Sequence, residues 1–258
     1  MTQPTEAQHL EVERRILDQA LRDAQVVRDA LAGGHTTVVN LMSAPGSGKT
    51  ELLGVIGDEL RAQGQSVAVL VGDCATEHDA DRLRSHVDWV HQIVTDGVCH
   101  LEARMLFPFL AEIGQLAPRY LFVENVGNMV CPVDFDLGEA VRIALLSVTE
   151  GEDKPVKYPG LFGAVDLVVV SKIDLASAVD FSLETVLGYL QRVNPGVPVI
   201  SSSAKTGVGL DAVIGAIRSL AAQGSSLTGQ GSSLTGQRSS MASNLPLAGG
   251  VRAASVGG

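Results

Sequence analysis

The sequence predicts an α/β fold, in which a doubly wound, mainly parallel sheet carries helices on both faces. Two observations indicate this class. Short apolar runs recur along the chain, and stretches with helical spacing of apolar residues separate them. Because such strands are apolar through their centres, both faces of the sheet must be covered. The chain has 258 residues, of which 45% are apolar, and this is ample for one large core.

The predicted elements begin with a helix over residues 6–31, which Gly33 and Gly34 end. Its apolar residues at helical spacing are Leu10, Leu17, Leu21, Ala24 and Leu31. Seven apolar runs are predicted as strands, at residues 37–42, 66–72, 87–94, 119–125, 141–148, 164–172 and 197–200. Helices are expected at residues 50–63, at residues 101–113 (where Pro108 should disturb the helix) and on both sides of the last strand.

These elements divide the chain into three parts. Residues 1–34 form a helical segment expected to pack on the main domain, and residues 35–222 form that domain. Residues 223–258 are rich in Ser and Gly and contain "GSSLTGQ" twice, at 224–230 and 231–237. Because this composition offers few apolar groups to bury, the tail is predicted to be disordered.

The bulk properties exclude several classes of protein. The net charge of −10 argues against nucleic acid and against anionic membrane as partners. No apolar run reaches the roughly 18 residues of a membrane span. The polar N-terminus does not resemble a secretory signal, and three cysteines do not form a disulfide framework in a chain this long. We therefore expect a protein of the reducing cytoplasm.

Residues 43–50, "SAPGSGKT", lie between a predicted strand and a predicted helix and match a Walker A phosphate loop. Ser43 stands where the first glycine usually lies. Backbone N–H groups of the loop and the helix N-terminus favour a phosphate. Lys49 is expected to reach the β- and γ-phosphates, and the Thr50 hydroxyl to bind Mg²⁺. The other loop residues predicted to hold the nucleotide are Gly46, Ser47 and Gly48.

Two acids follow neighbouring predicted strands and are candidates for the Mg²⁺ environment. Asp73 ends the second strand and Glu124 ends the fourth, so both should lie at the carboxyl edge of the sheet. Asp73 is equally placed to orient the attacking water, and either acid could instead be a helix cap or a solvated group. Asp79 is interpreted as a residue of a helix surface.

"SKID", residues 171–174, resembles the Asn-Lys-x-Asp motif that reads guanine, with Ser171 in the first place. The Asp174 carboxylate can accept from guanine N1–H and from its exocyclic amine, a donor pair that adenine lacks. The stem of Lys172 can cover the base. Ser171 replaces an amide that normally helps hold these loops together, and this is expected to weaken affinity for the nucleotide. The segment predicted to meet the guanine O6 edge is Ser203, Ala204 and Lys205. Together these motifs favour GTP over ATP and argue against a small-molecule kinase.

Cys99 and His100 are adjacent, at what is predicted to be a helix start, and Cys131 follows Glu124 by seven residues. Two thiolates and an imidazole suit Zn²⁺ or Ni²⁺. Three ligands leave a coordination position open, and two chains about a twofold axis could share the metal. The alternative is that the cysteines are small buried apolar residues and the histidine lies on the surface. Cys74 is interpreted as a packing residue or a spare thiol.

Five segments together resemble the HypB family of hydrogenase nickel incorporation GTPases, over about residues 10–220. They are "SAPGSGKT", "GDCATEHDADR", "GVCHLEARM", "ENVGNMVCPVDFDLGE" and "EGEDKPVKYP". The resemblance implies a P-loop GTPase domain and a cytoplasmic enzyme that hydrolyses GTP to GDP and phosphate. It also implies a GTP-dependent homodimer, with the hydrogenase large-subunit precursor and a nickel-binding accessory protein as partners.

The resemblance also implies roles for individual residues. Thr50, Asp73 and Glu124 match the Mg²⁺ environment, while Lys49 and Asp73 are the catalytic residues predicted from the phosphate loop and the strand end. Cys99, His100 and Cys131 match a Ni²⁺ or Zn²⁺ site. Lys154 matches a residue that acts across the dimer interface. No arginine finger is evident in the sequence, so the intrinsic hydrolysis rate is expected to be slow.

Two departures from the family pattern leave alternatives open. The N-terminal residues contain neither the Cys-rich nor the His-rich nickel motif of some relatives, and the repeated tail is not a family feature. The alternatives are a urease-type nickel accessory GTPase and a zinc- or nickel-binding scaffold with a mainly structural nucleotide site. Serines at positions 43 and 171, where the motifs usually have other residues, favour the scaffold slightly.

Overall fold

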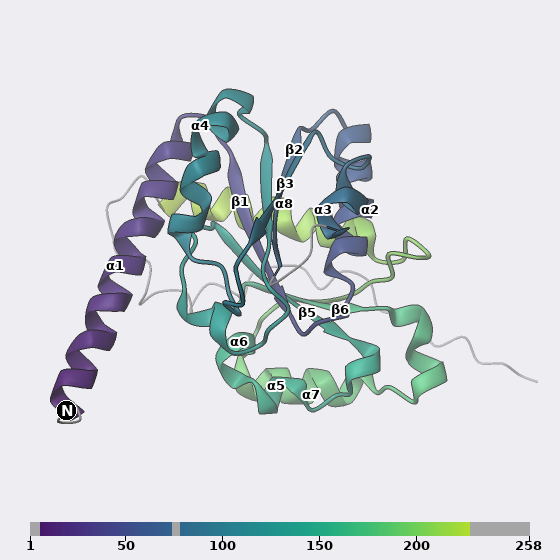
Figure 1. Ribbon diagram of the computed structural model, residues 1–258. Helices are drawn as coiled ribbons and strands as arrows, with labels where there is room; N and C mark the ends of the chain where they lie inside the picture. Colours follow the sequence, from purple (N-terminus) through teal and green to yellow (C-terminus); the bar gives the residue numbers. More distant parts are fainter. Residues whose placement is uncertain (1–5, 74–77, 228–258) are drawn as a thin grey trace, which may run out of the picture.

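A computed structural model describes residues 6–73 and 78–227 of the chain (Figure 1). Within these residues, seven parallel strands form one sheet in the order β3-β2-β4-β1-β5-β6-β7. The strands are β1 (Thr37–Ser43), β2 (Val67–Asp73), β3 (Trp89–Val94), β4 (Tyr120–Glu124), β5 (Val141–Ser147), β6 (Leu167–Ser171) and β7 (Val199–Ser201). The predicted doubly wound parallel sheet is confirmed.

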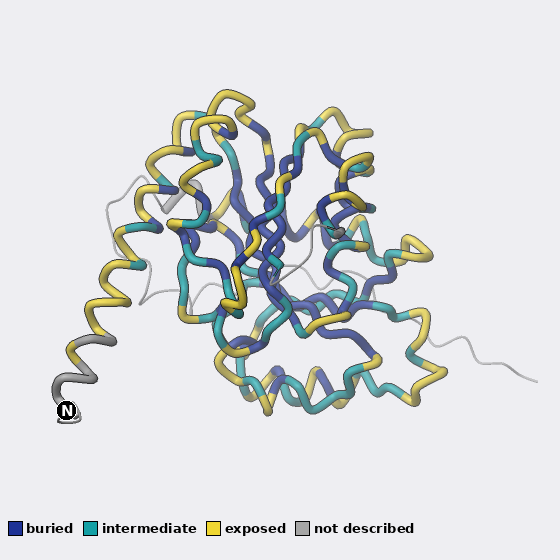
Figure 2. Tube along the Cα trace, viewed as in Figure 1, coloured by how far each residue is buried: buried dark blue, intermediate teal, exposed yellow. Residues whose placement is uncertain are grey.

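Helices cover both faces of this sheet (Figures 1 and 2). One face packs against α2 (Lys49–Ala62), α3 (His78–Leu83) and α8 (Leu210–Leu227). The other packs against α1 (Glu6–Ala32), α4 (Phe107–Leu116), α6 (Pro159–Gly163) and α7 (Leu183–Val193). The short helices are α5 (Lys154–Lys157) and the 3₁₀ helices η1 (Ala103–Leu106), η2 (Cys131–Asp134), η3 (Val148–Glu150) and η4 (Ile173–Val179).

Alternate residues of the central strands explain the two layers. In β1, Val39 and Leu41 face the α2 side, whereas Val38 faces α1. Every residue of β1 is buried. This is the expected result for a central strand of a parallel sheet, because helices cover both of its faces, and even the polar Thr37, Asn40 and Ser43 are buried there.

Among the described side chains of α1, the buried ones lie in its C-terminal part. Ala24, Val27 and Leu31 are buried, whereas Leu17 and Leu21 are 46% and 47% exposed. Figures 1 and 2 show the N-terminal half projecting away from the sheet. The predicted apolar stripe therefore continues beyond the part of the helix that the domain covers.

Two predicted helix boundaries differ from the structure. The helix expected at residues 101–113 is replaced by η1 followed by α4, with Pro108 in the first turn of α4. Proline is tolerated there because first-turn N–H groups have no partner within the helix. Helix α8 continues to Leu227, five residues past the expected domain end at 222, because each added residue of an established helix gains a hydrogen bond. Residues 228–258 lie outside the described part.

No helix among the described residues has the length and apolar content to cross a bilayer. The feature that positions the site is the order of the strands. Strands β2, β4 and β1 are neighbours, so their carboxyl ends meet at one rim of the sheet. Glu124 of β4 lies level with Leu41 of β1 and with Val71 of β2.

Candidate nucleotide pocket and metal cluster

The phosphate loop connects β1 to α2 with the geometry that the sequence predicts. Gly46 and Gly48 have φ values of 74° and 94°, in the left-handed region that side chains rarely adopt. Gly48 immediately precedes α2, so Lys49 and Thr50 form its first turn. Backbone N–H groups of the loop and of the α2 N-terminus thus line one concave turn, as phosphate binding requires.

The Lys49 ammonium is buried and donates to the Ser43 hydroxyl at 2.9 Å. Burial lowers the pKa of Lys49, while the negative charge of Glu124 opposes that shift. Ser43 also contacts the hydroxyl of Ser47. The serine at the first Walker position therefore supplies an acceptor that glycine would lack, and it holds the lysine within the loop.

Glu124 is the most unusual acid of this rim. It is 4% exposed, and Thr50 Oγ1 donates to its Oε1 at 2.9 Å. Burial raises the pKa of Glu124 to about 7, against the opposing charge of Lys49. Its other oxygen, Oε2, has no hydrogen-bond partner among the described residues. A carboxylate oxygen and a hydroxyl that converge in this way, with one oxygen unsatisfied, fit a hard divalent cation such as Mg²⁺.

Asp73 and Glu124 share a cavity of about 400 Å³ with the phosphate loop. The cavity is lined by Pro45, Gly46, Gly48, Lys49, Thr50, Glu51, Gly72, Asp73, Asp79, Arg82, Glu124, Asn125, Gly127 and Lys172. Asp79 lies on α3 with a partly exposed side chain, as expected of a helix-surface residue, and it also lines this cavity with Arg82.

The raised pKa of Glu124 predicts a pH-dependent stability. The folded protein holds this proton more tightly than the unfolded chain does, so the free energy of unfolding falls as pH rises from about 4.5 to about 7. Glu124→Gln removes the titration while keeping the shape. We compare the free energy of unfolding of Glu124→Gln with that of the wild type, both without nucleotide. The variant's gain over the wild type should be about 2 kcal/mol larger at pH 8 than at pH 5. Urea unfolding of both proteins in chelator-containing buffer measures this difference. An equal effect of Glu124→Gln at both pH values would contradict it.

At the base end of the cavity, Ser171 supplies a link between loops in place of the motif's usual amide, and the expected weaker affinity stays a prediction. Ser171 is buried, and its hydroxyl donates to the Ser47 carbonyl at 2.7 Å. Lys172 Nζ donates to the Gly46 carbonyl at 2.7 Å. Two consecutive side chains therefore tie the end of β6 directly to the phosphate loop, so the serine performs the linking role itself.

The remaining base-reading candidates lie close to this link. Ile173 N donates to the Ser202 carbonyl at 3.1 Å, which joins the two predicted base segments. Asp174 and Lys205 are exposed, Ala204 is half-buried and Ser203 is buried. The exposed Asp174 carboxylate is thus accessible to a base, as the guanine hypothesis requires.

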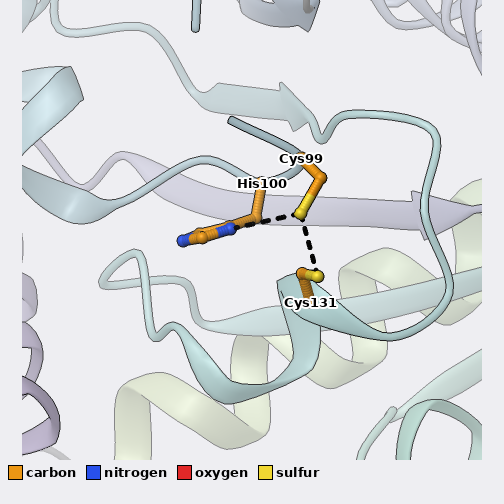
Figure 3. Close-up of side chains that lie close together, drawn as sticks. All are labelled: Cys99, His100 and Cys131. Carbon is orange, nitrogen blue, oxygen red and sulfur yellow. Dashed lines mark hydrogen bonds between the residues drawn. The ribbon is translucent and has the colours of Figure 1, made fainter. Parts of the chain in front are cut away.

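Cys99, His100 and Cys131 converge (Figure 3). Cys99 Sγ lies 2.9 Å from Cys131 Sγ and 3.9 Å from His100 Nδ1, and the ligand atoms of all three lie within 4.8 Å of one another. All three residues are half-buried, so neither cysteine is a core residue. The predicted helix start at Cys99 was wrong, because Cys99 and His100 lie in a bend after β3 while Cys131 begins η2.

The surroundings of the cluster favour a neutral imidazole. The ring of His100 stacks on Phe135 with centroids 3.9 Å apart, and burial lowers the pKa of His100. Its Nε2 has no hydrogen-bond partner among the described residues. The neighbouring Cys99 thiol raises the pKa of Cys131. Two sulfur atoms and an imidazole suit Zn²⁺ or Ni²⁺, and the thiols must lose their protons to bind either.

The segment "EGEDKPVKYP" runs from η3 into α5. Burial raises the pKa of Glu150, while the charges of Lys154, Lys172 and Lys49 oppose that shift. The segment is therefore electrostatically linked to the nucleotide cavity. The action of Lys154 across an interface stays a prediction. Cys74 lies outside the described residues.

Comparison with known proteins agrees with this geometry. Residues 37–201 match the family model for the CobW/HypB/UreG nucleotide-binding domain. The chain is 45% identical to hydrogenase maturation factor HypB of Azotobacter vinelandii, over 80% of this chain and 68% of the relative. It is 43% identical to HypB of Escherichia coli, over 78% of this chain and 69% of the relative.

Two solved structures are also similar. HypB from Helicobacter pylori in complex with nickel has a TM-score of 0.74 at 34% identity, covering 80% of this chain and 96% of that chain. HypB from Archaeoglobus fulgidus has a TM-score of 0.73 at 35% identity, covering 79% of this chain and 99% of that chain.

Proposed function

Since this chain belongs to the HypB family of hydrogenase maturation factors, within the CobW/HypB/UreG nucleotide-binding proteins, we propose that it is a GTP-hydrolysing metallochaperone. In this proposal it delivers nickel during the maturation of nickel–iron hydrogenase in the cytoplasm. The observation that carries the proposal is the segment from Glu124 to Cys131. This segment begins at the buried acid of the nucleotide cavity and ends at a thiol of the metal cluster, seven residues later.

Residues of the cavity, together with Asp174 outside its lining, would account for binding and hydrolysis. Lys49 and the loop N–H groups hold the β- and γ-phosphates, and Asp174 selects guanine. Thr50, Glu124 and Asp73 would hold Mg²⁺, which would neutralise charge that develops on the phosphates. Asp73, at the rim between β2 and the cavity, also orients the attacking water. Because the acids of this cavity are negatively charged, they would repel a triphosphate unless a cation lay between them. Binding of the triphosphate should therefore depend on Mg²⁺.

The metal cluster supports a dimer. Cys99, His100 and Cys131 give three ligands, so a fourth coordination position remains. A second copy about a twofold axis could complete or share the site. GTP then favours the homodimer, and Lys154 acts across the interface. The proposed partners are the hydrogenase large-subunit precursor and a nickel-binding accessory protein.

Nickel affinity is expected to depend on the nucleotide. A metallochaperone that releases metal on hydrolysis must bind it differently in its two nucleotide states, by about 5-fold or more. Titration of Ni²⁺ into the GDP-bound and the GTP-analogue-bound protein measures both affinities, and sedimentation of the same samples gives the oligomeric state. Equal affinity and equal stoichiometry in the two states would contradict nucleotide-coupled release while leaving the GTPase intact.

A second candidate is a role in urease maturation. The relative from Helicobacter pylori strain 26695, 42% identical over 172 residues, is described as a hydrogenase/urease maturation factor. Both roles use the same GTPase and the same metal cluster. Deletion strains assayed for each enzyme, with and without excess nickel, separate them. Unchanged hydrogenase activity in both media would contradict the first role.

A further inference from the structure

Asn125 touches both the nucleotide cavity and the loop of the metal cluster. It is 1% exposed, follows Glu124 and lines the cavity. Its Oδ1 accepts from the backbone N–H of Leu101 at 3.1 Å and from that of Val126 at 3.0 Å. Its Nδ2 donates to Asn40 Oδ1 at 3.3 Å. One buried amide thus bonds β1, the end of β4 and the residue after His100.

Leu101 also packs against Gly72, a residue that lines the nucleotide cavity. It is 0% exposed, and a Cβ placed on Gly72 would lie 2.7 Å from Leu101 Cγ. Gly72 itself lines the nucleotide cavity. Leu101 is therefore enclosed between Gly72 and Asn125, two residues of the nucleotide site, while its chain neighbour is a candidate metal ligand. We call Gly72, Leu101 and Asn125 the Leu101 clasp.

Farther along the segment that runs from Glu124 to Cys131, Gly127 packs on the phosphate loop and Asn128 bonds to the loop of Cys99. A Cβ on Gly127 would lie 2.9 Å from Pro45 Cα, so this segment packs directly on the phosphate loop. Asn128 Nδ2 donates to the Cys99 carbonyl at 3.4 Å, and Asn128 Oδ1 accepts from Val130 N at 2.8 Å. Asn128 is not among the residues that line the described nucleotide cavity. The two asparagines therefore have different neighbours: Asn125 contacts both sites, and Asn128 contacts the metal side.

We propose that Asn125 is the positioning residue that transmits the state of the nucleotide to the metal cluster. This inference rests on the proposed function. The Glu124 carboxylate would shift on binding a cation, and Asn125 would move with it because the two residues are adjacent. The Leu101 N–H follows the amide, which changes how Cys99 and His100 approach Cys131. Close packing makes such a shift pass between elements rather than dissipate.

The test compares Asn125→Ala with the matched variant Asn128→Ala. The Kd of Co²⁺, measured from thiolate–cobalt absorbance, is determined nucleotide-free, with Mg²⁺·GDP and with a Mg²⁺·GTP analogue, each nucleotide saturating. We expect Asn125→Ala to bring the ratio of the two nucleotide-bound Kd values to within about 2-fold of one, below the coupling expected of the wild type. Asn128→Ala should weaken both states by a common factor and so retain the wild-type ratio.

The outcomes separate this inference from the proposed function. A wild-type ratio in Asn125→Ala, or a collapsed ratio in Asn128→Ala, would overturn the assignment. If the wild type binds Co²⁺ with the same Kd in its GDP-bound and GTP-analogue-bound states, nucleotide-coupled release fails. The role of Asn125 in positioning the metal ligands is then tested on the nucleotide-free protein. There Asn125→Ala should weaken Co²⁺ binding about 10-fold, as loss of an outer-shell contact does, and an unchanged Kd would overturn it. If Asn125→Ala does not fold, Leu101→Val loosens the same clasp without removing a buried amide, and the same criteria apply.

Discussion

Replacing Lys49 with alanine is expected to lower the rate of GTP hydrolysis at least about 100-fold, which is the usual cost of removing one charged donor from a reacting phosphoryl or acyl group. The ammonium is buried in the phosphate loop, where a low local dielectric strengthens its interaction with the phosphates. Phosphate release in single-turnover experiments at saturating GTP and Mg²⁺ measures the rate.

Arg15→Ala is the matched control for this variant. Arg15 is an exposed cation of α1 that pairs with Glu11, so its loss should leave the rate unchanged. Thermal unfolding of both variants tests folding. Glu124 can take up a proton when Lys49 is lost, so Lys49→Ala should unfold at a temperature close to that of the wild type. Hydrolysis at the wild-type rate in folded Lys49→Ala would favour the alternative of a scaffold with a structural nucleotide site.

Replacing Cys99 and Cys131 together with serine is expected to weaken Ni²⁺ and Zn²⁺ binding by at least about 100-fold, because thiolates are the strongest donors of this site. The Sγ atoms of the two residues lie 2.9 Å apart, close enough to bind the same ion. The double substitution should therefore remove two ligands of one metal site. Competition with a chromophoric chelator measures affinity, and loss of thiolate–metal absorbance identifies the ligands.

Cys74→Ser is the matched control, since it removes the third cysteine of the chain and keeps Cys99, His100 and Cys131. It should bind metal with wild-type affinity. GTP hydrolysis by the double serine variant in metal-free buffer should also continue, since neither thiol lines the nucleotide cavity. Wild-type metal affinity in Cys99→Ser, Cys131→Ser would place the principal site elsewhere and remove the basis for the metallochaperone proposal.

Local patterns were enough to predict the strands and the phosphate loop. A buried parallel strand is mostly apolar on both faces, and a phosphate loop needs glycine where φ is positive, so both leave a direct record in the sequence. The convergence of Cys131 with Cys99 could be proposed from ligand chemistry. It could not be derived from spacing, because it depends on β4 lying beside β2 and on the bend after β3.

The misjudged features all depend on contacts between segments far apart in the chain. Leu101 was placed in a helix because its neighbours fit helical spacing, but Gly72 and Asn125 enclose it in an extended segment. The link that Ser171 makes was not foreseen because its partner, the Ser47 carbonyl, lies 124 residues earlier.

The unequal packing of α1 has a consequence for backbone protection. About 18 residues, spanning roughly 27 Å, precede Ala24, the first buried apolar residue of this helix among the described side chains. An isolated helix of that length is marginal in water, so its amides should exchange with deuterium orders of magnitude faster than those after Ala24. The N-terminal part of α1 should therefore exchange its amide hydrogens quickly, and the part after Ala24 slowly. A molecule that binds the N-terminal part would slow amide exchange there.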